Sequence, residues 1–291
     1  MTETPAAPAP RDEAAQARVR EHIATWEASC ADVVALLRSL TPADWDRPTE
    51  LPGWDVRAVA AHLAHLEGEL AGRPQPQVEV PAAPHVKGFM GQYTESGTIA
   101  RRDWKPQRIV DELEEVVAER RAALAANPPE DPSAPGPSFA ALAGWSWETL
   151  LHNRPFDIWM HEQDIRRAVG RPGGLDTPGA AHAGRVVARS LPMVVGKRGG
   201  AQAGQSVVLE LTDVPHPDLP SVLAVLVGDD GRARACDVGD LSGGPTATVR
   251  LDWVDWIRLG GGRASADEVE VLVEGDQELG RRVLAGLAVT P

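Results

Sequence analysis

Cysteine is almost absent from this chain of 291 residues, which contains only Cys30 and Cys236. The two thiols lie far apart in the sequence and neither belongs to a C-x-x-C motif, so a disulfide framework is excluded. Cys30 has the sequence environment of a buried helical position, and structural cysteines of that kind are usually inert. We therefore expect neither thiol to act as a nucleophile.

Basic residues are in the minority, because 29 lysines and arginines face 42 aspartates and glutamates and give a formal net charge of −13. No dense basic run could follow a phosphate backbone, which argues against a nucleic-acid partner. The sequence also lacks the roughly 18 consecutive apolar residues of a membrane span, and its first residues lack the layout of a signal peptide. These absences predict a cytoplasmic protein with no membrane partner.

Common catalytic motifs are missing as well. The glycine-rich run Gly260–Arg263 lacks the flanking strand and the Lys-Ser/Thr pair of a nucleotide-binding loop, and no G-x-S-x-G elbow occurs. Without an activated serine or a reactive cysteine, the chain has no evident nucleophile of its own. A metal ion, or a molecule bound to one, would have to supply the chemistry.

The composition that remains is that of a globular protein, with 43% hydrophobic and 24% charged residues. The length suits one large or two ordinary domains, and a change of periodicity favours two. Apolar residues recur at helical spacing in the first part, whereas short strand-like runs follow Gln205. The sequence predicts a helical domain over residues 11–174 and a smaller α+β domain over residues 175–291.

Four long helices are expected in the first domain, over residues 11–40, 56–70, 106–127 and 155–169. Asp55 is placed to cap the second of them. With these connections they would form an antiparallel four-helix bundle, a class in which metal sites are built from side chains on facing helices.

Two stretches of this domain are less regular in sequence. Pro155 is expected in the first turn of its helix, because proline inside a helix is costly, and residues 147–152 would be a separate turn or a kinked continuation. Residues 72–98 are rich in proline and glycine, which predicts a long irregular loop over a site.

The second domain should begin with a helix over residues 178–195 and a flexible run over residues 196–204. Short runs rich in β-branched residues then predict a mainly antiparallel sheet. The expected strands are 206–212, 222–228, 232–237, 246–252 and 268–273, with helices over 253–259 and 276–287.

Asp157 and His161 form a potential chelating pair, because residues four apart on a helix lie on the same side with Cβ atoms roughly 5–6 Å apart. The helix that carries His62 and His65 is the best source of a third ligand. A site of two imidazoles and one carboxylate leaves a fourth coordination position open, as catalytic zinc sites do.

The choice between these two histidines rests on position. His62 lies at the edge of the apolar stripe of its helix, and a histidine there is more often satisfied by a hydrogen bond than by a metal. His65 is its rival, with Glu69 one turn beyond. Asp164 is placed to accept the second imidazole N–H of His161, which would orient that ring.

The remaining histidines have no partner at metal-ligand spacing, although His85, in the irregular stretch 72–98, could approach the site. They are His22, His85, His152, His182 and His216.

Two sequence motifs resemble those of the mycothiol-dependent maleylpyruvate isomerase family. LPGWDVRAVAAHLAHLEGEL is similar to the first family motif, and RPFDIWMHEQDIRRAVG to the second. The stretches TATVRLDWVDWIRLGGGR and GDQELGRRVLAGLAVTP are similar to the smaller α/β domain of that family. The resemblance thus extends over most of the chain and implies a DinB-like four-helix bundle as the N-terminal domain.

In that family a divalent ion, usually zinc, is held by a histidine of the first motif and by a carboxylate and a histidine of the second. Carried over to this chain, the metal ligands are His62, Asp157 and His161. Asp157 stands where the family often has glutamate, so its shorter side chain would place the ion differently.

The resemblance also implies that the low-molecular-weight thiol mycothiol binds at the open metal position. A thiol bound to a cation is deprotonated and becomes a nucleophile near neutral pH. The expected function is a thiol transferase or isomerase acting on a small electrophile, as a monomer or homodimer. The alternative is a non-catalytic regulatory protein that carries a metal or binds a small ligand.

Overall fold

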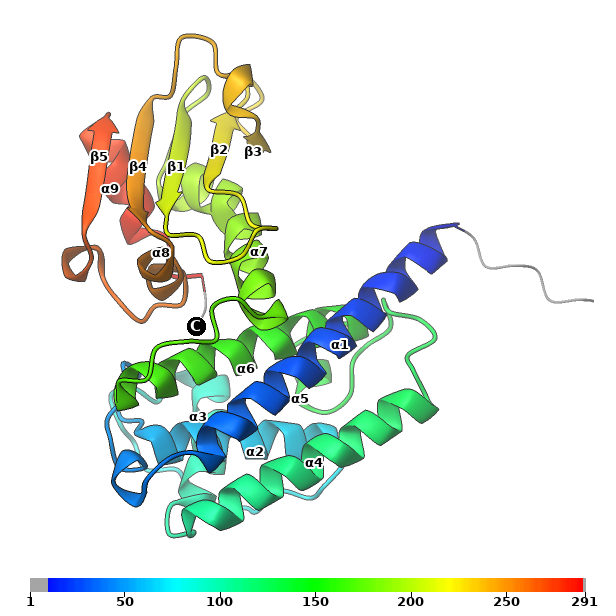
Figure 1. The fold of residues 1–291 in the computed structure, drawn as a ribbon. Helices are drawn as coiled ribbons and strands as arrows, with labels where there is room; N and C mark the ends of the chain where they lie inside the picture. Colours follow the sequence, from blue (N-terminus) through cyan, green and yellow to red (C-terminus); the bar gives the residue numbers. More distant parts are fainter. Residues whose placement is uncertain (1–9, 290–291) are drawn as a thin grey trace, which may run out of the picture. The chain divides into compact units, whose positions relative to one another are not determined.

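The computed structural model describes residues 10–289, which divide into two compact units between Gly173 and Gly174. The first unit is helical, and the second combines helices with a five-stranded sheet (Figure 1). This agrees with the predicted combination of a helical part and an α+β part. None of the helices in the described range has both the length and the apolar character that a membrane crossing requires.

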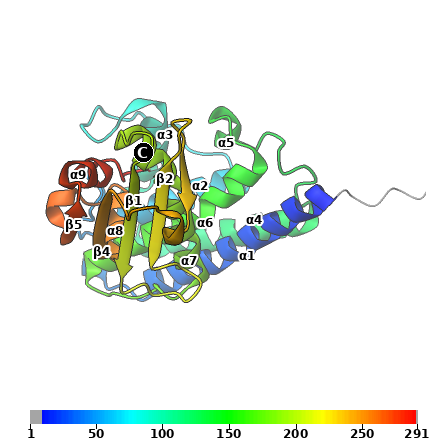
Figure 2. The same cartoon turned by 90° about the horizontal axis from the view of Figure 1, so that it is seen from above.

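Four long helices dominate the first unit, and α1 packs against α6 and α4 while α2 packs against α3, α4 and α6 (Figures 1 and 2). Their bounds are α1 Pro10–Arg38, α2 Val56–Leu70, α4 Pro106–Ala126 and α6 Trp147–Val169. The shorter elements are the 3-10 helix Pro42–Asp44, α3 Gly88–Arg101 and α5 Phe139–Leu142.

The core of this unit comes from the apolar stripes of these four helices. Trp26, Leu37, Val59, Leu63, Ile109, Leu113, Leu151 and Ile158 belong to one buried cluster. The predicted cap of α2 is confirmed, since the Asp55 carboxylate accepts the backbone N–H of Ala58 at 2.8 Å. The start of α2 fixes where the following histidines lie.

The prediction of an irregular stretch over residues 72–98 is wrong in its second half, where α3 begins at Gly88. Glycine lowers helix propensity, but packing against α2 overrides this weak local preference. Gly97 serves that packing directly, because a Cβ there would lie 2.3 Å from Cγ of His65. The glycine that argued against a helix is what lets α3 approach α2.

The prediction that Pro155 lies in the first turn of its helix is wrong, because Pro155 lies inside α6. Ser146 caps the helix by accepting the backbone N–H of Thr149 at 3.2 Å, so the stretch 147–152 is continuous with the rest. Proline removes one helical hydrogen bond, and the extensive burial of α6 offsets that cost. Gly170, at φ +66°, ends the helix as predicted.

The second unit begins with α7 (Pro178–Met193), which continues into a π-helical turn over Val194–Arg198 where the sequence suggested a flexible run. Its strands are β1 Ser206–Thr212, β2 Val222–Val227, β3 Ala233–Cys236, β4 Ala247–Asp252 and β5 Val271–Gly275. The other helices are α8 Trp253–Gly260, α9 Gln277–Ala285 and the 3-10 turns Val238–Asp240 and Ala266–Glu268.

The strand order in the sheet is β3-β2-β1-β4-β5. Only the β1–β4 pairing in this sheet is parallel, which confirms the prediction of a mainly antiparallel sheet. Helix α7 packs against β2 and β3, and α9 packs against β4 and β5. The last strand starts at Val271 rather than residue 268, because residues 266–268 form a 3-10 turn with a capping box from Ser265.

Candidate metal centre

His62 on α2 and the pair Asp157 and His161 on α6 meet in the helical unit. Each offers one ligand atom, and these atoms all lie within 4.8 Å of one another. Asp157 Oδ2 lies 3.6 Å from His62 Nε2, and Asp157 Oδ1 lies 3.6 Å from His161 Nε2. In tetrahedral zinc sites, neighbouring ligand atoms are about 3.4 Å apart. The donor set and its spacing therefore fit one divalent ion.

His62 is 4% exposed, and both of its ring nitrogens are buried without a hydrogen-bond partner. Buried ring nitrogens without a hydrogen-bond partner are uncommon in folded proteins. A bound metal ion would provide the missing partner for one of them. Burial lowers the pKa of His62 to about 4, although Asp157 works in the opposite direction. The imidazole is therefore neutral at pH 7, the state in which its nitrogen can bind a cation.

His161 is oriented by a buried carboxylate. Its Nδ1 lies 3.0 Å from Oδ2 of Asp164, which confirms the contact predicted for that residue. Arg167 donates to the other oxygen of Asp164 at 2.8 Å. With the Nδ1 proton donated to Asp164, the Nε2 lone pair faces Asp157, which is the arrangement that positions metal-bound histidines.

Asp157 is held by an arginine that sequence analysis missed. Arg154 Nη1 donates to Asp157 Oδ2 at 2.9 Å, and the same guanidinium donates to Glu67 Oε1 at 2.9 Å. Glu67 also accepts from Arg120 Nη1 at 2.5 Å. Burial raises the pKa of Asp157, but the positive charge of Arg154 outweighs it and holds that pKa well below its usual range. Asp157 is therefore ionised, as a metal ligand must be.

The indole of Trp54 forms an aromatic wall beside the two histidines. Its ring centroid lies 5.0 Å from that of His62 and 6.1 Å from that of His161. Trp54 Nε1 donates to Glu95 Oε2 at 2.8 Å, and His85 Nε2 lies 3.4 Å from the same oxygen. His85, which sequence analysis left as a histidine that could approach the site, is thus linked to the triad indirectly, through Glu95 and Trp54.

His65 lies outside the triad. Its Nδ1 is 2.8 Å from Gln75 Oε1, and its ring centroid is 5.4 Å from that of Tyr93. The structure therefore brings His62, and not its rival on the same helix, to Asp157 and His161.

The other histidines are also elsewhere. The rings of His22 and His152 contact each other at 5.1 Å, His182 is buried on α7, and His216 lies near Asp218.

Neither thiol has the environment of a nucleophile. Burial raises the pKa of Cys30 well above its usual value, and burial also raises that of Cys236. A thiol with a raised pKa carries little thiolate at neutral pH. This agrees with the expectation that neither cysteine reacts.

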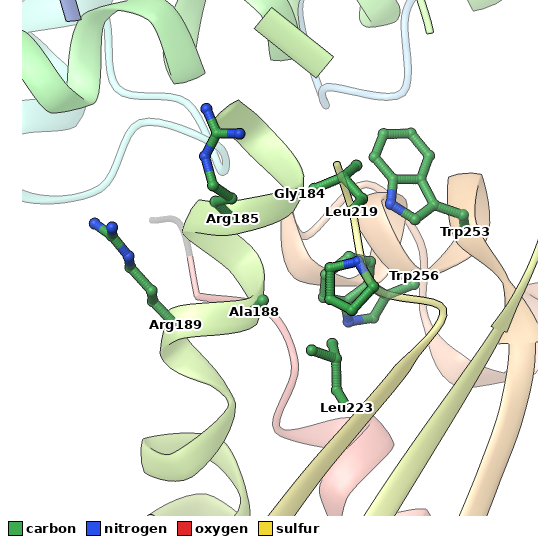
Figure 3. Close-up of a pocket in the computed structure, with 9 residues that line it drawn as sticks. Gly184, Arg185, Ala188, Arg189, Leu219, Leu223, Trp253 and Trp256 are labelled. Atoms are coloured by element: carbon green, nitrogen blue, oxygen red, sulfur yellow. The ribbon is translucent and has the colours of Figure 1, made fainter. Parts of the chain in front are cut away.

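The second unit contains a small pocket of about 160 Å3 beside α7. Figure 3 shows Leu219, Leu223, Trp253 and Trp256 gathered on one side of that helix. Arg185 and Arg189 also line it, but no histidine or carboxylate does. The pocket therefore offers no group for metal binding or proton transfer near neutral pH.

The chain is similar to a known protein family over part of its length. Residues 26–166 match the family described as the mycothiol maleylpyruvate isomerase N-terminal domain, a range that contains the whole triad. None of the curated proteins matches the chain significantly.

Two solved structures resemble the fold, one of the mycothiol-dependent maleylpyruvate isomerase and one of a histidine-to-alanine mutant of it. Each is 17% identical, covers 87% of this chain and 92% of its own, and the TM-scores are 0.48 and 0.49. At this level of similarity neither match supports any conclusion about this chain.

Proposed function

We propose that this chain is a metal-dependent, thiol-using enzyme, and the proposal is supported by the match of residues 26–166 to the mycothiol maleylpyruvate isomerase N-terminal domain family. The observation that carries the proposal is the meeting of three ligand atoms from two helices inside the matched range, each imidazole 3.6 Å from the shared carboxylate. Zinc is the favoured ion, because two imidazoles and one carboxylate are a common catalytic zinc set.

In this proposal His62, Asp157 and His161 would hold the ion, and the sulfur of mycothiol would bind to it as well. A divalent ion lowers the pKa of a bound thiol and so supplies a thiolate nucleophile near pH 7. The substrate would be a small electrophile, to which the thiol would add with formation of a carbon–sulfur bond. In an isomerase that bond would break again and release the thiol, whereas in a transferase it would remain in the product. Maleylpyruvate is the first substrate to test.

The surrounding residues keep the ligands in place and in the right protonation state. Asp164 accepts the Nδ1 proton of His161 and fixes the ring, and Arg154 keeps Asp157 ionised and restricts its rotation. The indole of Trp54 covers the two imidazoles and limits the access of water.

The proposal extends to the fold and the setting. Helices α1, α2, α4 and α6 would form a DinB-like four-helix bundle, and residues 11–174 and 175–291 would be the two domains. We propose a cytoplasmic enzyme that acts as a monomer or homodimer without a nucleic-acid or membrane partner.

One observation favours the non-catalytic alternative. Arg154 already contacts Asp157 Oδ2 at 2.9 Å, so part of the negative charge that would attract an ion is neutralised. A protein of that kind would hold metal weakly and serve in binding or regulation.

Metal content and turnover together decide between the two functions. The purified protein should hold close to one zinc per chain by elemental analysis and should isomerise maleylpyruvate only with mycothiol present. The variants His62→Ala and His161→Ala should each lose most of the metal and the turnover while keeping their far-UV circular dichroism. Full metal content in both variants would exclude this site.

A further inference from the structure

A second cavity, of about 410 Å3 and lined largely by polar residues, lies in the helical unit between α2, α3 and the segment that follows α2. His65 and Glu69 line it from α2, Gln75 and Gln77 from the following segment, and Tyr93 from α3. No residue of the metal triad lines it. It is large enough for an organic group of sugar size, since ligand pockets begin at about 300 Å3.

Two buried polar atoms of the cavity lining have no hydrogen-bond partner, His65 Nε2 and the Tyr93 hydroxyl. His65 is 2% exposed. Its Nδ1 faces Gln75 Oε1, and that amide is oriented because Gln75 Nε2 donates to the Arg73 carbonyl and Arg101 donates to Oε1. Since Nδ1 must donate to this oxygen, Nε2 is an acceptor that awaits a donor.

The charges at the cavity argue against an anionic ligand. Arg73 lines the cavity, but its guanidinium already forms ion pairs with Glu119 at 2.6 Å and Glu115 at 3.2 Å. Glu69 is half-buried, and one of its oxygens accepts from the Ser138 hydroxyl. The cavity thus presents acceptors at His65 and Glu69 for the hydroxyl groups of a ligand.

The aromatic ring of Tyr93 completes this wall. Phe89 stacks beside it at 6.2 Å and His65 lies at 5.4 Å, so the ring is braced on two sides. An aromatic surface next to several acceptors and one hydroxyl suits a ligand with an apolar C–H face and a rim of hydroxyl groups.

We propose that this cavity binds an uncharged polyhydroxylated group and holds the sugar and cyclitol part of the thiol cofactor. Mycothiol carries its cysteine on glucosamine linked to inositol, so it has such a group. His62 and Glu69 are seven residues apart on α2, a rise of about 10 Å, so a ligand that reaches from this cavity to the metal triad must span about that distance. The choice of occupant rests on the proposed function, whereas the preference for a polyol rests on the cavity alone.

The test uses the full-length protein and S-methylmycothiol, whose blocked sulfur cannot form a thiolate ligand. Saturation-transfer NMR should show transfer to the sugar and inositol protons, and calorimetry should give an affinity that Tyr93→Phe and His65→Phe each weaken at least tenfold. Both variants should keep their metal. Thr94→Val is the matched control, because it removes one hydroxyl from α3 away from the cavity wall and should change the affinity less than twofold.

The outcomes separate the two proposals. If His161→Ala loses its metal but still binds S-methylmycothiol within twofold of the wild type, the cavity acts independently of the metal site. Absence of metal from the wild type would sink the proposed function and leave the polyol site standing. The polyol site is overturned if S-methylmycothiol does not bind, or if both cavity variants bind it normally. Equal affinity for free inositol would overturn the assignment to the thiol cofactor.

Discussion

Replacing Arg154 by methionine tests the buried charge network behind the candidate metal centre. Arg154 is 1% exposed and Glu67 is fully buried, and the arginine bridges Glu67 to Asp157. Arg154→Met keeps much of the side-chain volume but leaves Glu67 with only Arg120 and Asp157 with no cation. Removing one partner of a buried ion pair costs about 3–5 kcal/mol, because the other charge stays buried and unpaired.

The same substitution should change how the protein responds to metal. Without Arg154, burial raises the pKa of Asp157 unopposed by that charge, so a bound cation becomes the main compensation. Zinc in excess should therefore stabilise Arg154→Met more than it stabilises the wild type. Ligand binding to the folded state contributes about 2.7 kcal/mol at a hundredfold excess over the dissociation constant, which is large enough to measure.

Urea unfolding followed by circular dichroism, with and without zinc, provides the assay. Arg73→Met is the matched control, because Arg73 also bridges two carboxylates but at the surface, where such pairs contribute about 0.2–1 kcal/mol. A loss in metal-free Arg154→Met no larger than that of Arg73→Met would refute the reasoning. Equal stabilisation of the variant and the wild type by zinc would refute the prediction that a bound cation compensates for the lost arginine.

Three further predictions follow from the same geometry. His65→Ala should keep its metal within experimental error by elemental analysis, since His65 contacts Gln75 and Tyr93 and not the triad; loss of metal there would mean that the wrong histidine was assigned. The double variant Cys30→Ala, Cys236→Ala should retain thiol-dependent turnover, because burial raises both thiol pKa values and neither cysteine belongs to the triad. Burial lowers the pKa of His65 from its usual value of about 6.5, so its contribution to the stability of the metal-free protein is present above pH 6.5 and is lost as the pH falls below it. His65→Phe should therefore lose less unfolding free energy than the wild type between pH 7.5 and pH 5, and equal losses would contradict this.

The parts of the site that sequence analysis found are those with a local signal. Asp157 and His161 are four residues apart on one helix, so their relative positions follow from helical geometry. The cap at Asp55 indicates only where His62 lies along α2, and not how α2 meets α6. The choice of His62 over His65 came from the resemblance to the first family motif, because the position of His62 at the edge of the apolar stripe left both histidines open.

The network behind the site left no such signal. Glu67 is separated by 53 residues from Arg120 and by 87 from Arg154. Nothing in a single sequence pairs charges over those distances, because the pairing depends on how α2, α4 and α6 pack. From sequence alone, an arginine three residues before Asp157 is equally consistent with a solvent-exposed position on the helix.

Elements of the fold were missed where packing overrides local preference. The glycines that suggested an irregular stretch are part of α3, and Gly97 accommodates His65. Pro155 lies inside α6 because the helix is buried on both sides of it. The parallel β1–β4 pairing was not predictable either, since it joins strands separated by two others in the sequence.

The central claim is that a metal held by His62, Asp157 and His161 binds the sulfur of an external thiol. It is tested most directly by substituting cobalt for zinc and titrating with mycothiol. The account predicts a sulfur-to-cobalt charge-transfer band that saturates at one thiol per chain and is absent in His62→Ala and His161→Ala. If cobalt occupies the triad and no band forms at saturating mycothiol, the thiol-using mechanism is contradicted.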